Sequence, residues 1–218
     1  MAGMRPKQRR PGVPKRVHPT KKKLLDVAVK LMADLPLAEI TTDLVLETSG
    51  ISRGSLYHHF EDLSDLLESA AVSIFAARVD ANIEMMRDFV THTGSAAEFL
   101  DKLFLLNEDA QAAESAPSRL FRMRLIALAG ENPRLAKKLA VEQDRLTDAF
   151  ETLITQSQQR GYFRDDVDPR AAAVLMQAYT LGRALDDVSS RPVAPDVWTQ
   201  MIKQLILRFI WNGDAATA

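Results

Sequence analysis

The segment TTDLVLETSGISRGSLYHHF, residues 41–60, predicts two short helices separated by a tight turn. The Thr41-Thr42 pair supplies an N-cap for the first helix, and Gly50 ends it. Ser52 caps the second helix, which continues to about Phe60. Together with a preceding third helix, this pair has the size of a helix-turn-helix domain.

The second of these helices has one apolar and one polar side. At about 100° per residue, His59 and Phe60 lie beside Leu56 and are expected to face the domain core. The opposite side is small and polar, and the N–H groups at the helix start favour an anion. It suits the DNA major groove, although an ordinary surface helix is the alternative interpretation. The polar side comprises Ser52, Arg53, Gly54, Ser55, Tyr57 and His58.

The composition limits the possible functions. The chain has 218 residues, of which 46% are hydrophobic, enough for a sizeable core. Because it has no cysteine, disulfides, thiol catalysis and cysteine metal clusters are excluded, and a reducing cytoplasm is the expected location. No apolar run reaches membrane-spanning length, and the basic N-terminus lacks the apolar stretch of a signal peptide.

Charge is divided unevenly along the chain. Residues 1–60 carry 11 Lys and Arg against 5 Asp and Glu, whereas residues 61–218 carry 17 against 24. A basic end on an acidic body favours a polyanion as the partner of that end, the alternative being a solvated basic tail. Residues 1–19 are rich in proline and basic side chains, so a disordered basic arm is expected there.

Helical signals continue to the end of the chain. Asn132-Pro133 and Asp168-Pro169 each supply an N-cap with proline at the first helical position, and no segment alternates with period two. The fold class is therefore all-α, with about nine helices in a three-helix N-terminal helix-turn-helix domain and a C-terminal helical bundle. The helices are expected at about 20–33, 42–50, 52–60, 64–93, 96–109, 118–129, 133–161, 169–188 and 196–212.

Residues 41–60 closely resemble the DNA-binding signature of the TetR (tetracycline-repressor) family of bacterial regulators. The likeness is carried by Gly50, Ser52-Arg53-Gly54 and Leu56-Tyr57-His58-His59-Phe60, within about residues 20–68. It implies a DNA-binding domain at 20–66 and a helical effector-binding and dimerisation domain at 67–218.

The resemblance also implies roles by position. Thr42 and Tyr57 would hold phosphates, and Gly54 would allow close packing on the groove. Leu56 and Phe60 would lock the reading helix to its domain. The residues that would read or approach bases are Arg53, Ser55 and His58.

Two features depart from the family pattern. The family usually places a phosphate-binding lysine where Leu63 stands, and Glu61 and Asp62 lie beside it. The second helix carries larger residues than the usual alanines, namely Leu44, Leu46, Thr48 and Ser49. Phosphate affinity is therefore expected to depend more on the basic arm. Nonspecific affinity is the favoured role of the arm, and entry into the adjacent minor groove is the alternative. The basic residues concerned are Arg16, Lys21, Lys22 and Lys23.

The last two predicted helices are more apolar than a small monomer can hide. In 169–188 the apolar positions step by four and three residues, as in a helix–helix seam, and 196–212 bears a broad apolar stripe. A homodimer is expected, and the resemblance agrees, because family members pair through these helices. Two reading heads would then meet major grooves about 34–36 Å apart. The expected interface comprises Val174, Ala178, Leu181, Leu185, Trp198, Met201, Ile202, Leu205 and Phe209.

The middle helices are rich in methionine and aromatic residues, which either fill the core or line a pocket for an apolar or amphipathic ligand. The resemblance favours a pocket, because family members often bind small effectors in this region. Arg124 is expected to be partly buried and paired with an internal acid or a ligand carboxylate. The expected lining is Met85, Phe89, Phe104, Phe121, Arg124, Met176 and Tyr179.

Catalysis finds little support, because the four histidines have neither metal-ligand spacing nor a paired nucleophile. We therefore expect a cytoplasmic, homodimeric, ligand-responsive repressor that binds a palindromic double-stranded DNA operator. No cofactor, metal or membrane partner is expected. The main alternative is a helical effector- or protein-binding module with weak DNA binding, and a helical enzyme is a more remote one.

Overall fold

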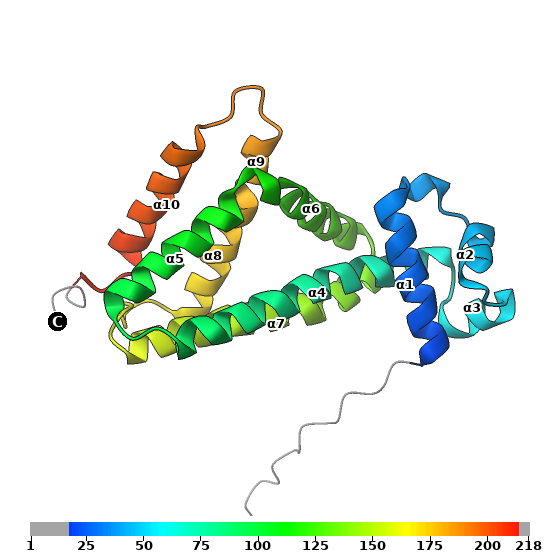
Figure 1. Ribbon diagram of the computed structural model, residues 1–218, viewed down its shortest axis with the longest axis horizontal. Helices are drawn as coiled ribbons and strands as arrows, with labels where there is room; N and C mark the ends of the chain where they lie inside the picture. The colour runs from blue at the N-terminus through cyan, green and yellow to red at the C-terminus, as the bar shows by residue number, and fades with distance from the viewer. Residues whose placement is uncertain (1–17, 214–218) are drawn as a thin grey trace, which may run out of the picture. The chain divides into compact units, whose positions relative to one another are not determined.

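The computed structural model describes residues 18–213, so residues 1–17 of the predicted arm, Arg16 among them, lie outside the described residues. Within that range all the regular elements are helices, which confirms the all-α prediction. The β-type pairing there is a single isolated bridge between Phe163 and Trp211, which is too short to be a strand. The helices are α1 Pro19–Asp34, α2 Thr42–Ser49, α3 Arg53–His59, α4 Leu63–Thr91, α5 Ala96–Gln111, α6 Ala116–Glu131, α7 Pro133–Gln159, α8 Pro169–Gly182, α9 Ala184–Asp187 and α10 Pro195–Phe209 (Figure 1).

Most helix boundaries fall close to the predicted ones because local capping determines them. The side chains of Thr41, Ser52, Asn132 and Asp168 each accept a hydrogen bond from the first turn of the helix that follows. At α1 the cap is His18, two residues before the predicted start of the helix at residue 20.

The helix predicted over 169–188 divides at Arg183 into α8 and the short α9. The Arg183 guanidinium donates to Asp186 at 2.6 Å and to the backbone oxygen of Val193 at 3.3 Å. This side chain therefore ties the break to the loop that follows α9.

The described chain divides into two compact units after Ala70. The N-terminal unit contains α1, α2, α3 and the first turns of α4, and the C-terminal unit contains the rest of α4 and α5 to α10. The division falls inside α4, close to the predicted domain boundary at residue 66. Among the described helices, none has the length and apolar character needed to cross a membrane.

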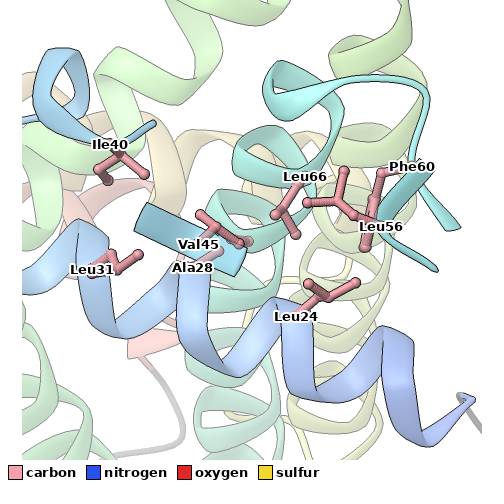
Figure 2. Close-up of a cluster of buried hydrophobic side chains, with 9 residues drawn as sticks. Leu24, Ala28, Leu31, Ile40, Val45, Leu56, Phe60 and Leu66 are labelled. Atoms are coloured by element: carbon pink, nitrogen blue, oxygen red, sulfur yellow. The ribbon is translucent and has the colours of Figure 1, made fainter. Parts of the chain in front are cut away.

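The N-terminal unit is built around one apolar core (Figure 2). The helical spacing on α1 turns three of its side chains toward α2, α3 and the start of α4. The core consists of Leu24, Ala28, Leu31, Ile40, Val45, Leu56, Phe60, Leu66 and Ala70.

The C-terminal unit packs α7 against α6 and α8, and α5 against α10. Arg145 on α7 bridges Asp80 on α4 and Glu142 on its own helix, so α4 and α7 lie side by side within this unit. Phe99 on α5 contacts the rings of Phe89 and Trp211, with centroids 4.6 and 6.4 Å away. This aromatic cluster fixes the end of α10 to α4 and α5.

Candidate DNA-binding surface and ligand cavity

The reading helix α3 is positioned by its buried side. Leu56 and Phe60 are inserted into the core of the N-terminal unit and are almost completely buried. Gly50 adopts a left-handed conformation with φ of 63°, which ends α2 and lets the chain turn into α3. The Ser52 hydroxyl accepts a hydrogen bond from the Ser55 N–H at 3.2 Å and caps α3.

The opposite side of α3 is exposed and polar. Ser52, Arg53, Gly54 and His58 are exposed, and Tyr57 leaves 47% of its surface accessible. Ser55 is partly buried and hydrogen-bonds through its hydroxyl to Ser52. The structure thus gathers the predicted side chains on one face.

Packing within the chain does not require a glycine at position 54. A Cβ built there meets no atom within 4 Å, and the residue has ordinary helical backbone geometry. The missing side chain therefore leaves open space on the exposed face of α3, where a groove edge could approach.

Arg53 already has a partner in the free protein. Its guanidinium forms an ion pair with Asp43 in the first turn of α2, and both side chains are largely exposed. Sequence reasoning missed this contact, because the two residues meet only when α2 and α3 fold together. Thr42, beside Asp43, is partly buried.

The three lysines that follow Thr20 belong to the first turns of α1, within the helix predicted to begin at residue 20. Lys21 lies over the Phe60 ring, with Nζ 5.2 Å from its centroid, and Lys22 pairs with Asp26 at 2.7 Å. Lys23 is exposed. Their positive charge is thus fixed on a helix.

His59 contacts two other imidazoles, one tilted and one edge-on to its ring, instead of entering the core as predicted. The His18 and His58 rings lie 4.9 and 5.0 Å from it between centroids. Burial, then the charges of His18, His58 and Lys21, lower the pKa of His59 below its ordinary value. Neutral His59 is therefore favoured near neutral pH.

The acidic residues beside Leu63, which stands in place of the expected lysine, stabilise the start of α4. Asp62 accepts a hydrogen bond from the Asp65 N–H at 2.6 Å, and the Glu61 N–H donates to the Asp65 carboxylate at 2.9 Å. Asp62 thus caps the first turn of α4 and Asp65 holds the residue before it, and both acids complement the helix dipole. Leu63 begins α4.

A cavity of about 250 Å³ lies inside the C-terminal unit. It is lined mainly by apolar side chains of α4, α5, α7 and α8. Among the residues predicted for a pocket, four line it, namely Met85, Phe89, Met176 and Tyr179. Burial raises the pKa of Tyr179 to about 12, so this phenol stays neutral in the cavity at neutral pH.

Three predicted lining residues lie elsewhere. Phe104 packs beneath the ammonium of Lys203 on α10, and Phe121 lies beneath the guanidinium of Arg78. Arg124 is exposed, so its expected burial is wrong. The arginines of α6 that line the cavity are instead Arg119 and Arg122.

Arg119 is neutralised within the chain. Its Nε and Nη2 donate to the two carboxylate oxygens of Asp187 on α9, each at 2.8 Å, and its Nη1 donates to the backbone oxygens of Ala110 and Ala112. The pair is almost fully buried. It joins α6 to α9 and to the end of α5.

Arg122, one turn further along α6, has uncharged partners. Its Nη2 donates to the side-chain oxygens of Gln143 and Gln177, each at 2.8 Å, and its guanidinium lies 5.4 Å from the centroid of the Phe75 ring. Burial lowers the pKa of Arg122 to about 10, so it is still charged at neutral pH. No sequence signal separated Arg122 from Arg124.

Apolar side chains of α8 to α10 remain exposed in the single chain. Leu185, Met201 and Phe209 expose 73%, 63% and 65% of their surfaces, and Val174 and Ala178 on α8 are also exposed. We call these five residues the apolar seam.

The other residues predicted for an interface are buried, or make contacts, within the single chain. Ile202 is buried in the core, which makes its placement in an interface wrong. Leu181 lines the cavity. Leu205 is partly buried, and Trp198 donates its indole N–H to Gln111 at 3.0 Å.

Comparison with known proteins agrees with this geometry. Residues 24–70 match the sequence profile of bacterial regulatory proteins of the tetR family. The chain is 25% identical over 152 residues to the HTH-type transcriptional repressor KstR2 of Mycobacterium tuberculosis. The aligned residues cover 70% of this chain and 73% of that repressor. Residues 24–70 therefore carry a regulatory domain of the tetR family, and over most of its length the chain is similar to a DNA-binding transcriptional repressor.

Solved structures share the fold across both units. A Saccharomonospora viridis protein solved in complex with choline has a TM-score of 0.60 at 19% identity, covering 88% of this chain and 97% of its own. The regulator FadR of Bacillus subtilis, in complex with stearoyl-CoA, has a TM-score of 0.57 at 16% identity, covering 86% and 97%. Likeness at these identities concerns the fold alone.

Proposed function

We propose that this regulator binds a palindromic operator as a homodimer, acts in the cytoplasm as a repressor, and releases DNA when a small effector occupies the cavity of the C-terminal unit. The observation that carries the proposal is the exposed polar face of α3, held in place by the buried Leu56 and Phe60. A helix fixed by its apolar side presents its polar side to a groove with little freedom to reorient.

On this face, individual side chains take distinct roles. Arg53, Ser55 and His58 approach base edges, while Tyr57 and Thr42 hold phosphates. The N–H groups at the start of α3 and the lysines of α1 supply further phosphate contacts. Since Lys21 and Lys22 have partners in the free chain, Lys23 provides the least encumbered charge.

The apolar seam supports the dimer. Leu185, Met201 and Phe209 are large apolar side chains that a monomer would leave in water. A two-fold pairing of α8, α9 and α10 with the same helices of a second copy buries these side chains. Such a dimer presents two copies of α3, and a palindromic site mirrors that symmetry.

The route from effector to DNA runs through α4. This helix contributes Leu66 to the core of the N-terminal unit and Phe75, Met85 and Phe89 to the cavity of the C-terminal unit. An effector that fits the cavity in only one position of α4 changes the spacing of the two reading heads.

Selection from a pool of random DNA duplexes tests the DNA-binding part. The full-length protein is expected to enrich a palindrome, and Tyr57→Phe and Arg53→Ala are each expected to weaken binding to it. Loss of the Arg53 side chain should also relax the sequence preference, whereas loss of the Tyr57 hydroxyl should weaken binding to all DNA sequences by a similar factor.

Two results would contradict the proposal. Failure to enrich any sequence at low salt would favour a helical effector- or protein-binding module with weak DNA binding. Enrichment of a site without two-fold symmetry would exclude the dimeric mode of reading.

A further inference from the structure

The cavity holds a positive charge that the chain does not neutralise. Arg122 lines it, and its hydrogen-bond acceptors are the amide oxygens of Gln143 and Gln177. Within residues 18–213, no carboxylate forms an ion pair with this guanidinium, and its Nε is buried without an acceptor. Amide dipoles solvate the charge but leave it uncompensated.

Arg119 shows what a purely structural arginine looks like at the same place. It lies one turn away on α6 and is satisfied by a two-point contact with Asp187 and by two backbone oxygens. The contrast matters because burying an unpaired charge is costly. A chain that provides a carboxylate for one arginine and none for its neighbour leaves the second available for an external anion.

Asn107 gives an independent indication of a missing ligand. Its side chain lines the same cavity and is 5% exposed, yet neither its amide nitrogen nor its oxygen has a hydrogen-bond partner. Buried amides are nearly always satisfied, so both atoms require an explanation. The Tyr179 hydroxyl, also on the cavity wall, offers a further donor.

The lining otherwise consists mostly of apolar side chains, which specifies the rest of the ligand. Phe75, Met86, Phe89 and Leu153 surround the space with rings, thioethers and methyl groups. At ~30 Å³ per water molecule, a cavity of about 250 Å³ has room for roughly eight waters or a short hydrocarbon chain.

We infer that the effector is an amphipathic carboxylate whose anionic end pairs with Arg122 and hydrogen-bonds to Asn107, while its hydrocarbon part fills the apolar remainder of the cavity. This inference rests on the proposed function of the cavity as the effector site. The fold alone does not give it, because the similar structures hold ligands as different as choline and stearoyl-CoA.

The test compares ligands that differ only in their polar end. Binding of octanoate, octanol and octylamine to the full-length protein is measured by calorimetry at neutral pH, and hexanoate, decanoate and dodecanoate establish the best chain length. Octanoate is expected to bind at least about tenfold more tightly than octanol, because charge-assisted hydrogen bonds are stronger than neutral ones. Octylamine is expected to bind least.

Three variants assign the preference to particular side chains. Arg122→Met, which keeps an unbranched apolar stem but removes the charged guanidinium, should abolish the acid preference and leave octanol binding within about threefold. Asn107→Leu should reduce the preference by about threefold. Arg124→Gln, which removes an exposed arginine from the same helix, is the matched control and should change nothing.

Several results would overturn the inference. They are equal binding of octanoate and octanol, tighter binding of octylamine, an acid preference that survives Arg122→Met, or no binding by any acid of the series. The comparison of ligands on the unaltered protein stands even if a variant fails to fold. The assay contains no DNA, so acid binding without an enriched DNA site would contradict the proposed repressor alone.

Discussion

At the scale of single residues, Asp43 controls how much of Arg53 is available to DNA. The ion pair between them holds the guanidinium against α2 in the free protein, and a carboxylate beside the reading face repels phosphate. The pair is exposed, so its own contribution to stability is small, at about 0.2–1 kcal/mol.

We predict that Asp43→Asn increases affinity for the operator by up to about fivefold, because Arg53 no longer has to leave a partner. The nonspecific affinity should also rise, as a negative charge is lost near the DNA. Fluorescence anisotropy at several salt concentrations measures both. Asp34→Asn, at the far end of α1, is the control, and unchanged or weaker binding by Asp43→Asn would contradict the role given to Arg53.

At the scale of elements, the glycine in α3 lowers the stability of the helix, and the packing of the chain does not explain its presence. Glycine in a helix is less favourable than alanine by about 0.5–1 kcal/mol, and the space around Gly54 is empty. The helix is therefore less stable than its surroundings allow.

We predict that Gly54→Ala raises the free energy of unfolding by about 0.5–1 kcal/mol while weakening DNA binding about tenfold, because the new methyl group occupies the groove-facing side. Thermal denaturation and anisotropy on the same samples measure the two effects. Gly130→Ala in α6 also meets open space and should stabilise the protein without affecting DNA. If the Gly54→Ala variant binds DNA as tightly as the unaltered protein, the surface that contacts DNA does not include this side of α3.

The same scale explains which features could be predicted from sequence. Short helices with caps at Thr41 and Ser52 are determined by neighbouring residues, so their boundaries and the exposed face of α3 follow from local rules. The orientation of α6 does not follow from local rules. Its apolar pattern places Arg124 inward, but Arg119 and Arg122 are buried because Asp187, Gln143 and Gln177 stand opposite them.

Those partners come from α7, α8 and α9, far along the chain, and no local pattern indicates them. Phe104 and Phe121 illustrate the same limit, since each is a plausible wall residue until Lys203 or Arg78 is found over its ring. Cation–ring contacts of this kind depend on tertiary packing, which the periodicity of one helix does not contain.

At the scale of the whole molecule, the apolar seam is expected to determine the oligomeric state. We predict that Leu185→Glu with Phe209→Glu converts the dimer to a folded monomer, because both side chains are exposed in the single chain and their replacement leaves its core intact. Sedimentation velocity with circular dichroism measures assembly and folding together.

The monomer should lose most of its operator affinity, because one reading head makes half of the contacts. Val141→Glu is the control, since Val141 is also exposed but lies on α7, outside the seam. A double variant that remains dimeric would show that the copies meet through another surface.

The exposed side chains of the seam also have a consequence for gene dosage. If two chains must meet before either reads an operator, the amount of active protein at low expression grows with the square of the number of chains synthesised. Halving the synthesis of such a regulator would remove about three quarters of its dimers, by mass action. The cell would then switch its target over a narrow range of expression, with a threshold set by how tightly Leu185, Met201 and Phe209 hold their counterparts.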